Sequence, residues 1–207
     1  MSHHQGEINW RLLTRQGVDF AYIKATQGSD FRDPAFATNW AGAGTAGIPR
    51  GAYHYFSLCR PGAEQAANFI ATVPQDPAML SPAIDLEFMG NCDQRAKPVA
   101  LIVELREFIR LVEARYHKRV LLYLTREFDA GYAVSAQIDR PLWLRSLIVE
   151  PKWGRRHWAL WQASNFRTLA GIEGRVDWDV MAPREPALDT RPPTDAAPAI
   201  VKAGDRP

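Results

Sequence analysis

The stretch SPAIDLEF, residues 81–88, has the pattern of a short buried strand that opens with a proline. Proline is tolerated there because its missing N–H costs least at the start of a strand. Side chains alternate between strand faces, so Asp85 and Glu87 share one face and Ile84, Leu86 and Phe88 share the other. Two carboxyl groups this close resist ionising together, and we expect one pKa to rise and the other to fall. Such a pair can supply an acid and a base at neutral pH; two solvated acids on an edge strand are the alternative.

Length and composition are those of an ordinary globular domain. The chain has 207 residues, of which 46% are hydrophobic and 23% charged, and its net charge is +2. Because the basic residues are scattered and form no stripe, we expect no nucleic-acid partner. No apolar run approaches the ~20 residues that cross a bilayer, so we expect no membrane span. The simplest expectation is a monomer.

Strand and helix patterns alternate through the first two thirds of the chain, which favours a parallel sheet with right-handed crossovers. Strands are predicted at residues 18–25, 50–56, 81–88, 119–125, 141–145, 157–162 and 176–180. Helices are predicted from near Asn9 to residue 16, and at 34–46, 61–73 and 98–117.

The predicted strands crowd together in the last third and leave little room for helices. A complete eightfold barrel takes ~250 residues, so we predict an α/β fold that is a modified TIM-like β/α barrel with abbreviated late helices. This domain is expected to span residues 1–183. Residues 184–207 hold many prolines and alanines and no aromatic residue, and they predict a disordered tail.

Polar and aromatic residues gather at the predicted strand ends, where catalytic groups of parallel barrels lie. They are Lys24, Tyr53, His54, Tyr55, Asp85, Glu87, Tyr123, Trp161 and Gln162, with Asp177 shortly after the last of them. A carboxylate cleft lined by rings suits a sugar, because ring faces stack on sugar faces while carboxylates and amides take the hydroxyls. The alternative is that the rings are ordinary core residues.

No other chemistry has a convincing set of residues. His3 and His4 are adjacent, and neighbouring side chains on extended backbone face opposite ways, so we expect no metal and no cofactor. A serine nucleophile elbow of the G-x-S-x-G kind is absent from the sequence. Cys59 and Cys92 each follow a predicted strand; a disulfide and two unpaired loop cysteines both fit that spacing.

Taken in order, several stretches resemble the glycoside hydrolase family 25 lysozymes, the Chalaropsis-type N-acetylmuramidases. The matching stretches are SHHQGEINW (2–10), GVDFAYIKATQG (17–28), DPAFATNWAGAGTAGIPRGAYHYF (33–56), PAIDLEF (82–88), LWQAS (160–164) and GIEGRVDWDVM (171–181). They extend over nearly the whole predicted domain, and their order and spacing make the resemblance specific.

The resemblance implies a barrel with fewer helices than usual and hydrolysis of the β-1,4 bond between N-acetylmuramic acid and N-acetylglucosamine in peptidoglycan. In the family's D-x-E motif, Glu87 would be the general acid and Asp85 the supporting carboxylate. Asp177 would complete the acidic floor. The implied substrate-binding residues are Tyr53 and Trp161, with Gln162, Lys24 and Tyr123 as further candidates for the groove walls.

The chain departs from the family pattern at two places. An aspartate is expected two residues before Ser2, where this sequence begins with Met1 in the intervening position. Either the true start lies upstream, with an export signal that makes the protein periplasmic or extracellular, or Met1 is the true start of an impaired, cytoplasmic glycan-binding module. We favour the upstream start. The second departure is Arg145, where the family commonly has a small residue; it is expected to narrow the groove.

Overall fold

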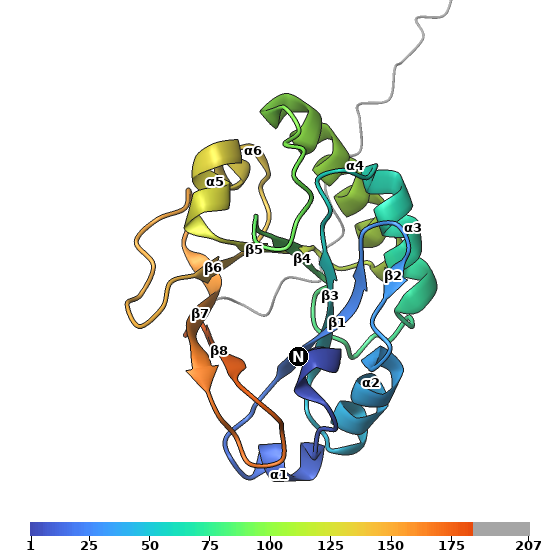
Figure 1. Cartoon of the computed structure of the whole chain (residues 1–207), viewed down its shortest axis with the longest axis vertical. Coiled ribbons are helices and arrows are strands. Elements are labelled where there is room, and N and C mark those ends of the chain that lie inside the picture. Colours follow the sequence, from blue (N-terminus) through green and yellow to red (C-terminus); the bar gives the residue numbers. More distant parts are fainter. Residues whose placement is uncertain (184–207) are drawn as a thin grey trace, which may run out of the picture.

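The computed structural model describes residues 1–183 and has a mixed α/β fold with one curled sheet of eight strands (Figure 1). The strands are β1 Ala21–Gln27, β2 Phe31–Arg32, β3 Arg50–Tyr55, β4 Ala83–Leu86, β5 Leu121–Leu124, β6 Leu142–Arg145, β7 Trp158–Arg167 and β8 Val176–Met181. The helices are the 3-10 turn η1 His3–Gln5, then α1 Trp10–Thr14, α2 Phe36–Thr45, α3 Gly62–Thr72, α4 Pro98–Tyr116, α5 Arg126–Tyr132 and α6 Val134–Gln137. The predicted tail at 184–207 lies outside the described residues.

The sheet runs in the order β2-β1-β3-β4-β5-β6-β7-β8. Strands β1 and β3 to β7 are parallel to their neighbours, as the alternating pattern predicts, while β2 and β8 are antiparallel additions at the two ends. Within residues 1–183 no pairing joins β8 to β1 or β2. The sheet is therefore a curled half-barrel, and the full TIM-like description stays an expectation.

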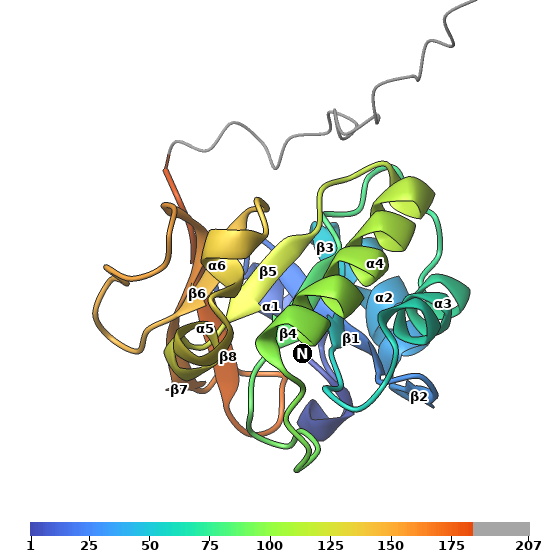
Figure 2. The same ribbon diagram turned by 90° about the horizontal axis from the view of Figure 1, so that it is seen from above.

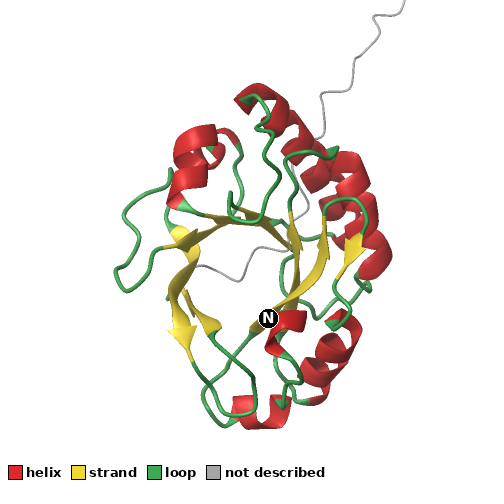
Figure 3. Ribbon diagram, in the orientation of Figure 1, coloured by secondary structure: helices red, strands yellow, loops and turns green. Residues whose placement is uncertain are grey.

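Helices cover only part of the outer face of the sheet (Figures 1 and 3). Helices α2, α3 and α4 cover the side formed by β1, β3 and β4, and Figure 2 shows α4 lying across that side. After β5 the only helices within residues 1–183 are α5 and α6, of 7 and 4 residues. The late part of the chain thus has the short helices that its length predicted.

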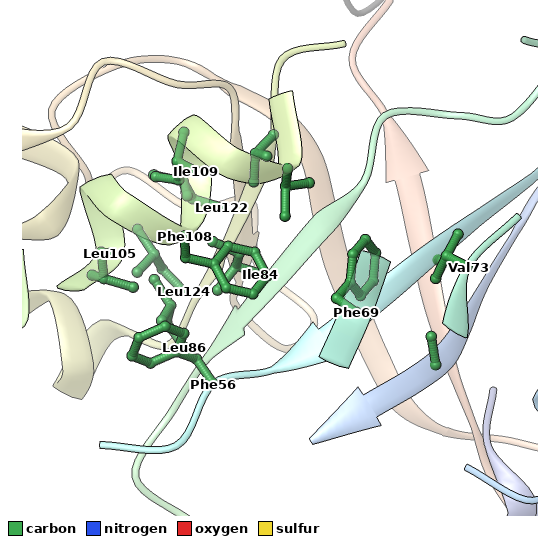
Figure 4. Packing of buried hydrophobic residues seen from close by; sticks show 14 of the residues in the cluster. Phe56, Phe69, Val73, Ile84, Leu86, Leu105, Phe108, Ile109, Leu122 and Leu124 are labelled. Carbon is green, nitrogen blue, oxygen red and sulfur yellow. The ribbon is translucent and has the colours of Figure 1, made fainter. Parts of the chain in front are cut away.

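The main hydrophobic core lies between these helices and the outer face of the sheet. Figure 4 shows Ile84 and Leu86 of β4 packed against Phe108 and Ile109 of α4, with Phe56 beside them. Each of these five side chains is at most 3% exposed. A smaller cluster fills the inner face from Tyr22, Ala83, Leu121, Tyr123, Trp143, Ala159 and Leu160. The sheet is consequently buried on both faces over most of its length.

Most predicted elements are present within a few residues of their expected ends. Helix α1 begins after Asn9, whose side chain accepts a hydrogen bond from the Leu12 amide, so the predicted cap is confirmed. The sequence patterns did not predict β2, α5 and α6, and the strand predicted at 157–162 is five residues shorter at its end than β7. Helix α5 does carry a local start signal, because the Thr125 hydroxyl caps the Phe128 amide. None of the helices in residues 1–183 is long and apolar enough to cross a membrane.

Candidate active site

Side chains of β4 alternate between the two faces of the sheet as predicted. One set packs in the hydrophobic core and the other faces a cavity. Ile84 and Leu86 are fully buried against the helices. Asp85 and Glu87 lie on the opposite face and line a cavity of about 240 Å³ inside the curl of the sheet. Glu87 directly follows β4, at the carboxyl edge of the parallel strands. The two carboxyl groups therefore meet where parallel sheets present their catalytic groups.

Five of the eight predicted site residues line this cavity. They come from four strands and the position directly after β4: Tyr53, Asp85, Glu87, Tyr123 and Asp177. The remaining wall is built from Met1, Gly17, Val18, Asp19, Phe20, Ala21, Tyr22, Trp143, Leu169, Val176, Trp178 and Asp179. Rings and carboxyl groups thus share one hollow, as a sugar-binding cleft requires.

A row of polar and aromatic side chains crosses the sheet at the level of Asp85. Asp85 is in register with Tyr55 of β3 and Tyr123 of β5, and Tyr123 is in register with Trp143 of β6. Residues paired across parallel strands point to the same face. One Asp85 oxygen, Oδ1, is buried and has no hydrogen-bond partner among the described residues. This carboxyl is thus free to bind a group that enters the cavity.

The expected splitting of the two pKa values is wrong in direction for one member. Burial raises the pKa of Asp85 well above its usual value, with the charge of Glu87 as the next cause. Burial also raises the pKa of Glu87, opposed by Arg145 and supported by Asp177. Both carboxyl groups therefore hold protons more strongly than free carboxylic acids. Desolvation, which raises each pKa, outweighs the nearby positive charges, which lower it. The pair therefore keeps a proton available for donation up to a higher pH than free carboxylic acids do.

The sequence model of the family "Glycosyl hydrolases family 25" matches residues 1–172 of this chain. The chain belongs to glycosyl hydrolase family 25. It is a glycoside hydrolase of the lysozyme class.

Relatives and solved structures of this family agree over most of the described fold. Lysozyme M1 of Streptomyces globisporus is 31% identical over 193 residues, covering 86% of this chain and 64% of that protein, so the chain spans less than two thirds of this relative. A family 25 glycosyl hydrolase from Bacillus anthracis has a TM-score of 0.83 at 37% identity, covering 89% of this chain and 88% of that chain. The bacterial lysozyme from Streptomyces coelicolor has a TM-score of 0.78 at 28% identity, with 87% and 89% coverage.

The loop after Glu87 is anchored to the loop after β3. The Asn91 side-chain amide donates to the carbonyls of Glu87 at 3.1 Å and Phe56 at 2.9 Å, and its oxygen accepts from the Leu58 amide at 2.9 Å. A disulfide joins Cys59 to Cys92 with a Cα–Cα distance of 6.3 Å. Of the two arrangements left open by the cysteine spacing, the structure has the disulfide. Asn91 is a positioning group that sequence reasoning missed.

Lys24 supplies a cation at the rim of the cleft without lining the cavity. Its Nζ donates to Gln27 Oε1 at 2.7 Å and lies 5.2 Å from the Tyr55 ring and 5.5 Å from the Phe31 ring. Burial lowers the pKa of Lys24, and the neighbouring carboxylates, Asp85 foremost, oppose that change. The side chain is therefore oriented by an amide and two rings near the acidic pair.

Gln162 and Trp161 are neighbours in sequence but face opposite ways. The Tyr123 hydroxyl donates to Gln162 Oε1 at 2.6 Å, so Gln162 supports a residue of the cavity wall from beneath. Trp161 packs against the outer core, and its indole N–H donates to the Ser146 carbonyl at 2.6 Å. Adjacent strand residues must point to opposite faces. The binding role of Trp161 stays a prediction.

His54 does not join the site with the other strand-end residues. Its ring is fully buried in the outer core, within 2.7 Å of Thr26 Oγ1 and 3.0 Å of Gln65 Oε1. Burial lowers the pKa of His54 to about 4, so the ring is neutral at ordinary pH. The sequence prediction for this residue is wrong because His54 falls between Tyr53 and Tyr55, and therefore on the other strand face.

His3 and His4 lie in the turn η1 and not on extended backbone, so the expectation that their rings diverge is wrong. The ring centroids are 4.0 Å apart. His3 Nδ1 is 2.7 Å from the buried Asp33 carboxylate, so the His3 ring already has a polar partner within the fold. Within residues 1–183 no group of three or more metal-ligating side chains could hold an ion.

Proposed function

We propose that this family 25 protein hydrolyses peptidoglycan at the β-1,4 bond between N-acetylmuramic acid and N-acetylglucosamine. The observation that carries the proposal is the carboxyl pair of Asp85 and Glu87, which shares one face of β4 inside a ring-lined cavity. The similarity to Lysozyme M1 and to the bacterial lysozyme from Streptomyces coelicolor supports the same substrate. Since the polymer lies outside the cell membrane, we expect an exported protein, periplasmic or extracellular.

Glu87 is the general acid in this proposal. A general acid must carry a proton at working pH and reach the oxygen of the leaving sugar. Burial raises the pKa of Glu87, and its position directly after β4 puts it at the accessible edge of the sheet. In the first step Glu87 would protonate the glycosidic oxygen as the bond to the anomeric carbon breaks. Negative charge from Asp177 favours that protonated form.

Asp85 orients the sugar, and in its ionised form it stabilises the positive charge that develops on the sugar. Its Oδ1 is buried and has no partner among residues 1–183, so a polar group of the substrate can take that bond. Tyr53 and Tyr123 would form the cavity walls against which the sugar packs. Lys24, Gln162 and Trp161 do not line the cavity and stay further candidates for contacts with the substrate. Attack by a carboxylate and attack by the substrate's own acetamido group both use this acid.

The proposal is tested with purified protein and isolated cell walls. We expect the turbidity of the wall suspension to fall, and the released fragments to carry new reducing ends on N-acetylmuramic acid. Clearing should continue in the presence of a chelator. Walls that bind the protein but release no fragments would contradict the enzyme proposal and support a catalytically impaired glycan-binding module. New reducing ends on N-acetylglucosamine would contradict the choice of bond.

Arg145, at the end of β6, affects the acid strength of Glu87, so replacing it should shift the pH dependence of activity in one direction. Its charge lowers the pKa of Glu87. In Arg145→Gln the Glu87 proton should therefore persist to higher pH, and the alkaline limb of kcat/KM should move upward. We expect the ratio of activity at pH 8 to activity at pH 6 to rise about two- to three-fold.

The matched control for Arg145 is Arg110→Gln, which removes the same charge from the exposed face of α4. Its pH profile should equal that of the unchanged protein. An Arg145→Gln profile that also superposes on the unchanged one would show that Arg145 exerts no such control.

A further inference from the structure

Asp179 places a second carboxyl group behind Asp177 on β8. The two residues are separated by one position, so their side chains share the inner face of the strand, and both line the cavity. Asp179 is in register with Gln162 of β7, the residue that supports Tyr123. Sequence reasoning identified Asp177 alone, although the same alternation that paired Asp85 with Glu87 applies here.

Trp143 fixes the Asp179 carboxyl in place. The indole Nε1 donates to Asp179 Oδ1 at 2.7 Å. The indole is 7% exposed and is held between two phenol rings, with centroids 4.9 Å from Tyr22 and 5.1 Å from Tyr123. An indole nitrogen can only donate, so Oδ1 must accept in either protonation state and the other oxygen carries any proton. Asp179 is thus the far end of the row that begins at Asp85 and runs through Tyr123 and Trp143.

The charged and titratable groups that face Asp179 come from three parts of the chain. Asp177 lies on the same strand, Tyr22 lies on β1, and the N-terminal amine of Met1 hydrogen-bonds to the Tyr22 carbonyl at 3.0 Å. Burial, with help from Asp177, raises the pKa of Asp179 to about 7, while the Trp143 bond and the amine oppose the change. Asp179 therefore exchanges its proton near neutral pH.

We propose that Asp179, held by Trp143, is a positioning residue that acts on the cleavage reaction by setting the charge of the cavity wall that it shares with Asp177. When Asp179 loses its proton, a negative charge appears behind Asp177 and makes the acidic wall of the cavity more negative. Asp177 is one of the groups that favour the protonated form of Glu87. The charge on Asp179 acts on Glu87 in the same direction as the charge on Asp177 and keeps the proposed acid protonated as the pH rises. The inference rests on the proposed function, because it presumes that Glu87 donates the proton.

The first test compares kcat/KM on solubilised peptidoglycan at pH 5.5 and pH 8 for the full chain and for Asp179→Asn. The amide oxygen of asparagine can still accept from Trp143 but never acquires a charge. We expect the ratio of activity at pH 8 to activity at pH 5.5 to fall about three-fold in the variant. A purely structural role would change both activities equally and leave the ratio unmoved, and that result would overturn the inference. Asp30→Asn, in the exposed turn between β1 and β2, is the matched control.

Two further variants test whether the hydrogen bond from Trp143 to Asp179 controls this pH dependence. Trp143→Phe keeps a ring between Tyr22 and Tyr123 but removes the donor, so the proton on Asp179 should persist to higher pH and the ratio should also fall. In the double variant with Asp179→Asn the ratio should equal that of Asp179→Asn alone, because the two changes act on one group. Ratios that multiply in the double variant would contradict the link.

Thermal unfolding separates a failure of this inference from a failure of the proposed function. The folded-state pKa of Asp179 lies above the unfolded value, so its contribution to stability falls as the pH rises from about 4 to about 7. Asp179→Asn lacks that loss, and its melting temperature relative to the unchanged protein should be several degrees higher at pH 8 than at pH 5. A difference that does not vary with pH would contradict the titration. An unchanged protein that clears no wall at any pH would contradict the proposed function instead.

Discussion

Glu87→Gln is expected to lower wall clearing by about 10²- to 10⁴-fold, the usual contribution of a general acid. Glutamine has the same shape and can reach the leaving oxygen, but its amide is far too weak an acid to protonate it. Binding to intact walls should be nearly unchanged, because the cavity keeps its rings and its other carboxyl groups. The measurement is kcat/KM for release of reducing ends, together with co-sedimentation of the protein with walls.

Stability provides the check that this loss is chemical. Burial raises the folded-state pKa of Glu87 above its unfolded value. The unchanged protein therefore loses stability as the pH rises from the unfolded pKa to the folded pKa of this group. Glutamine carries no such penalty, and the variant should melt at the same temperature as the unchanged protein or higher at pH 7. The control Glu127→Gln makes the same substitution on the exposed face of α5 and should leave clearing intact. A Glu87→Gln protein that keeps more than a tenth of its activity would rule out Glu87 as the acid.

The sequence predicted best the features that depend on local periodicity. The face shared by Asp85 and Glu87 follows from alternation along one strand, and the structure keeps it. The same alternation pairs Asp179 with Asp177 on β8. At residues 161 and 162 it separates Trp161 from Gln162. Both features therefore follow from the sequence itself.

Other features could not be read from local pattern because they depend on burial or on contacts distant in sequence. The pKa of Asp85 rises mainly through desolvation, which depends on the packing of the folded chain around β4, with β3 and β5 on its two sides. Repulsion within the pair is the smaller cause, and it alone was visible in the sequence. The role of Asn91 is equally hard to predict, since its bonds to Glu87, Phe56 and Leu58 reach residues 4 to 35 positions away. Loop polarity alone does not predict such anchoring.

Loss of the Cys59–Cys92 disulfide should mainly reduce stability, whereas loss of Asn91 should mainly reduce activity. The disulfide closes a loop across a sequence separation of 33 residues, and removing such a crosslink typically costs about 2–4 kcal/mol of unfolding free energy. For a domain of this size, Cys59→Ser with Cys92→Ser should lower the melting temperature by about 5–15 °C. The unchanged protein should show the same fall in a reducing agent, and identical melting with and without reductant would contradict the prediction.

Activity at 25 °C distinguishes the two anchors, because of the two only Asn91 bonds to the backbone of Glu87. In the serine variant Asn91 still binds the Glu87 and Phe56 carbonyls and the Leu58 amide, and the Tyr55 hydroxyl still donates to the Met89 carbonyl at 2.6 Å. The backbone of the proposed acid therefore keeps its position, and kcat/KM should fall less than about three-fold. Asn91→Ala leaves the disulfide intact but frees that backbone, and a displacement of about 1 Å at a catalytic group can cost about 10²-fold. A serine variant that loses more activity than Asn91→Ala would assign the positioning of Glu87 to the disulfide.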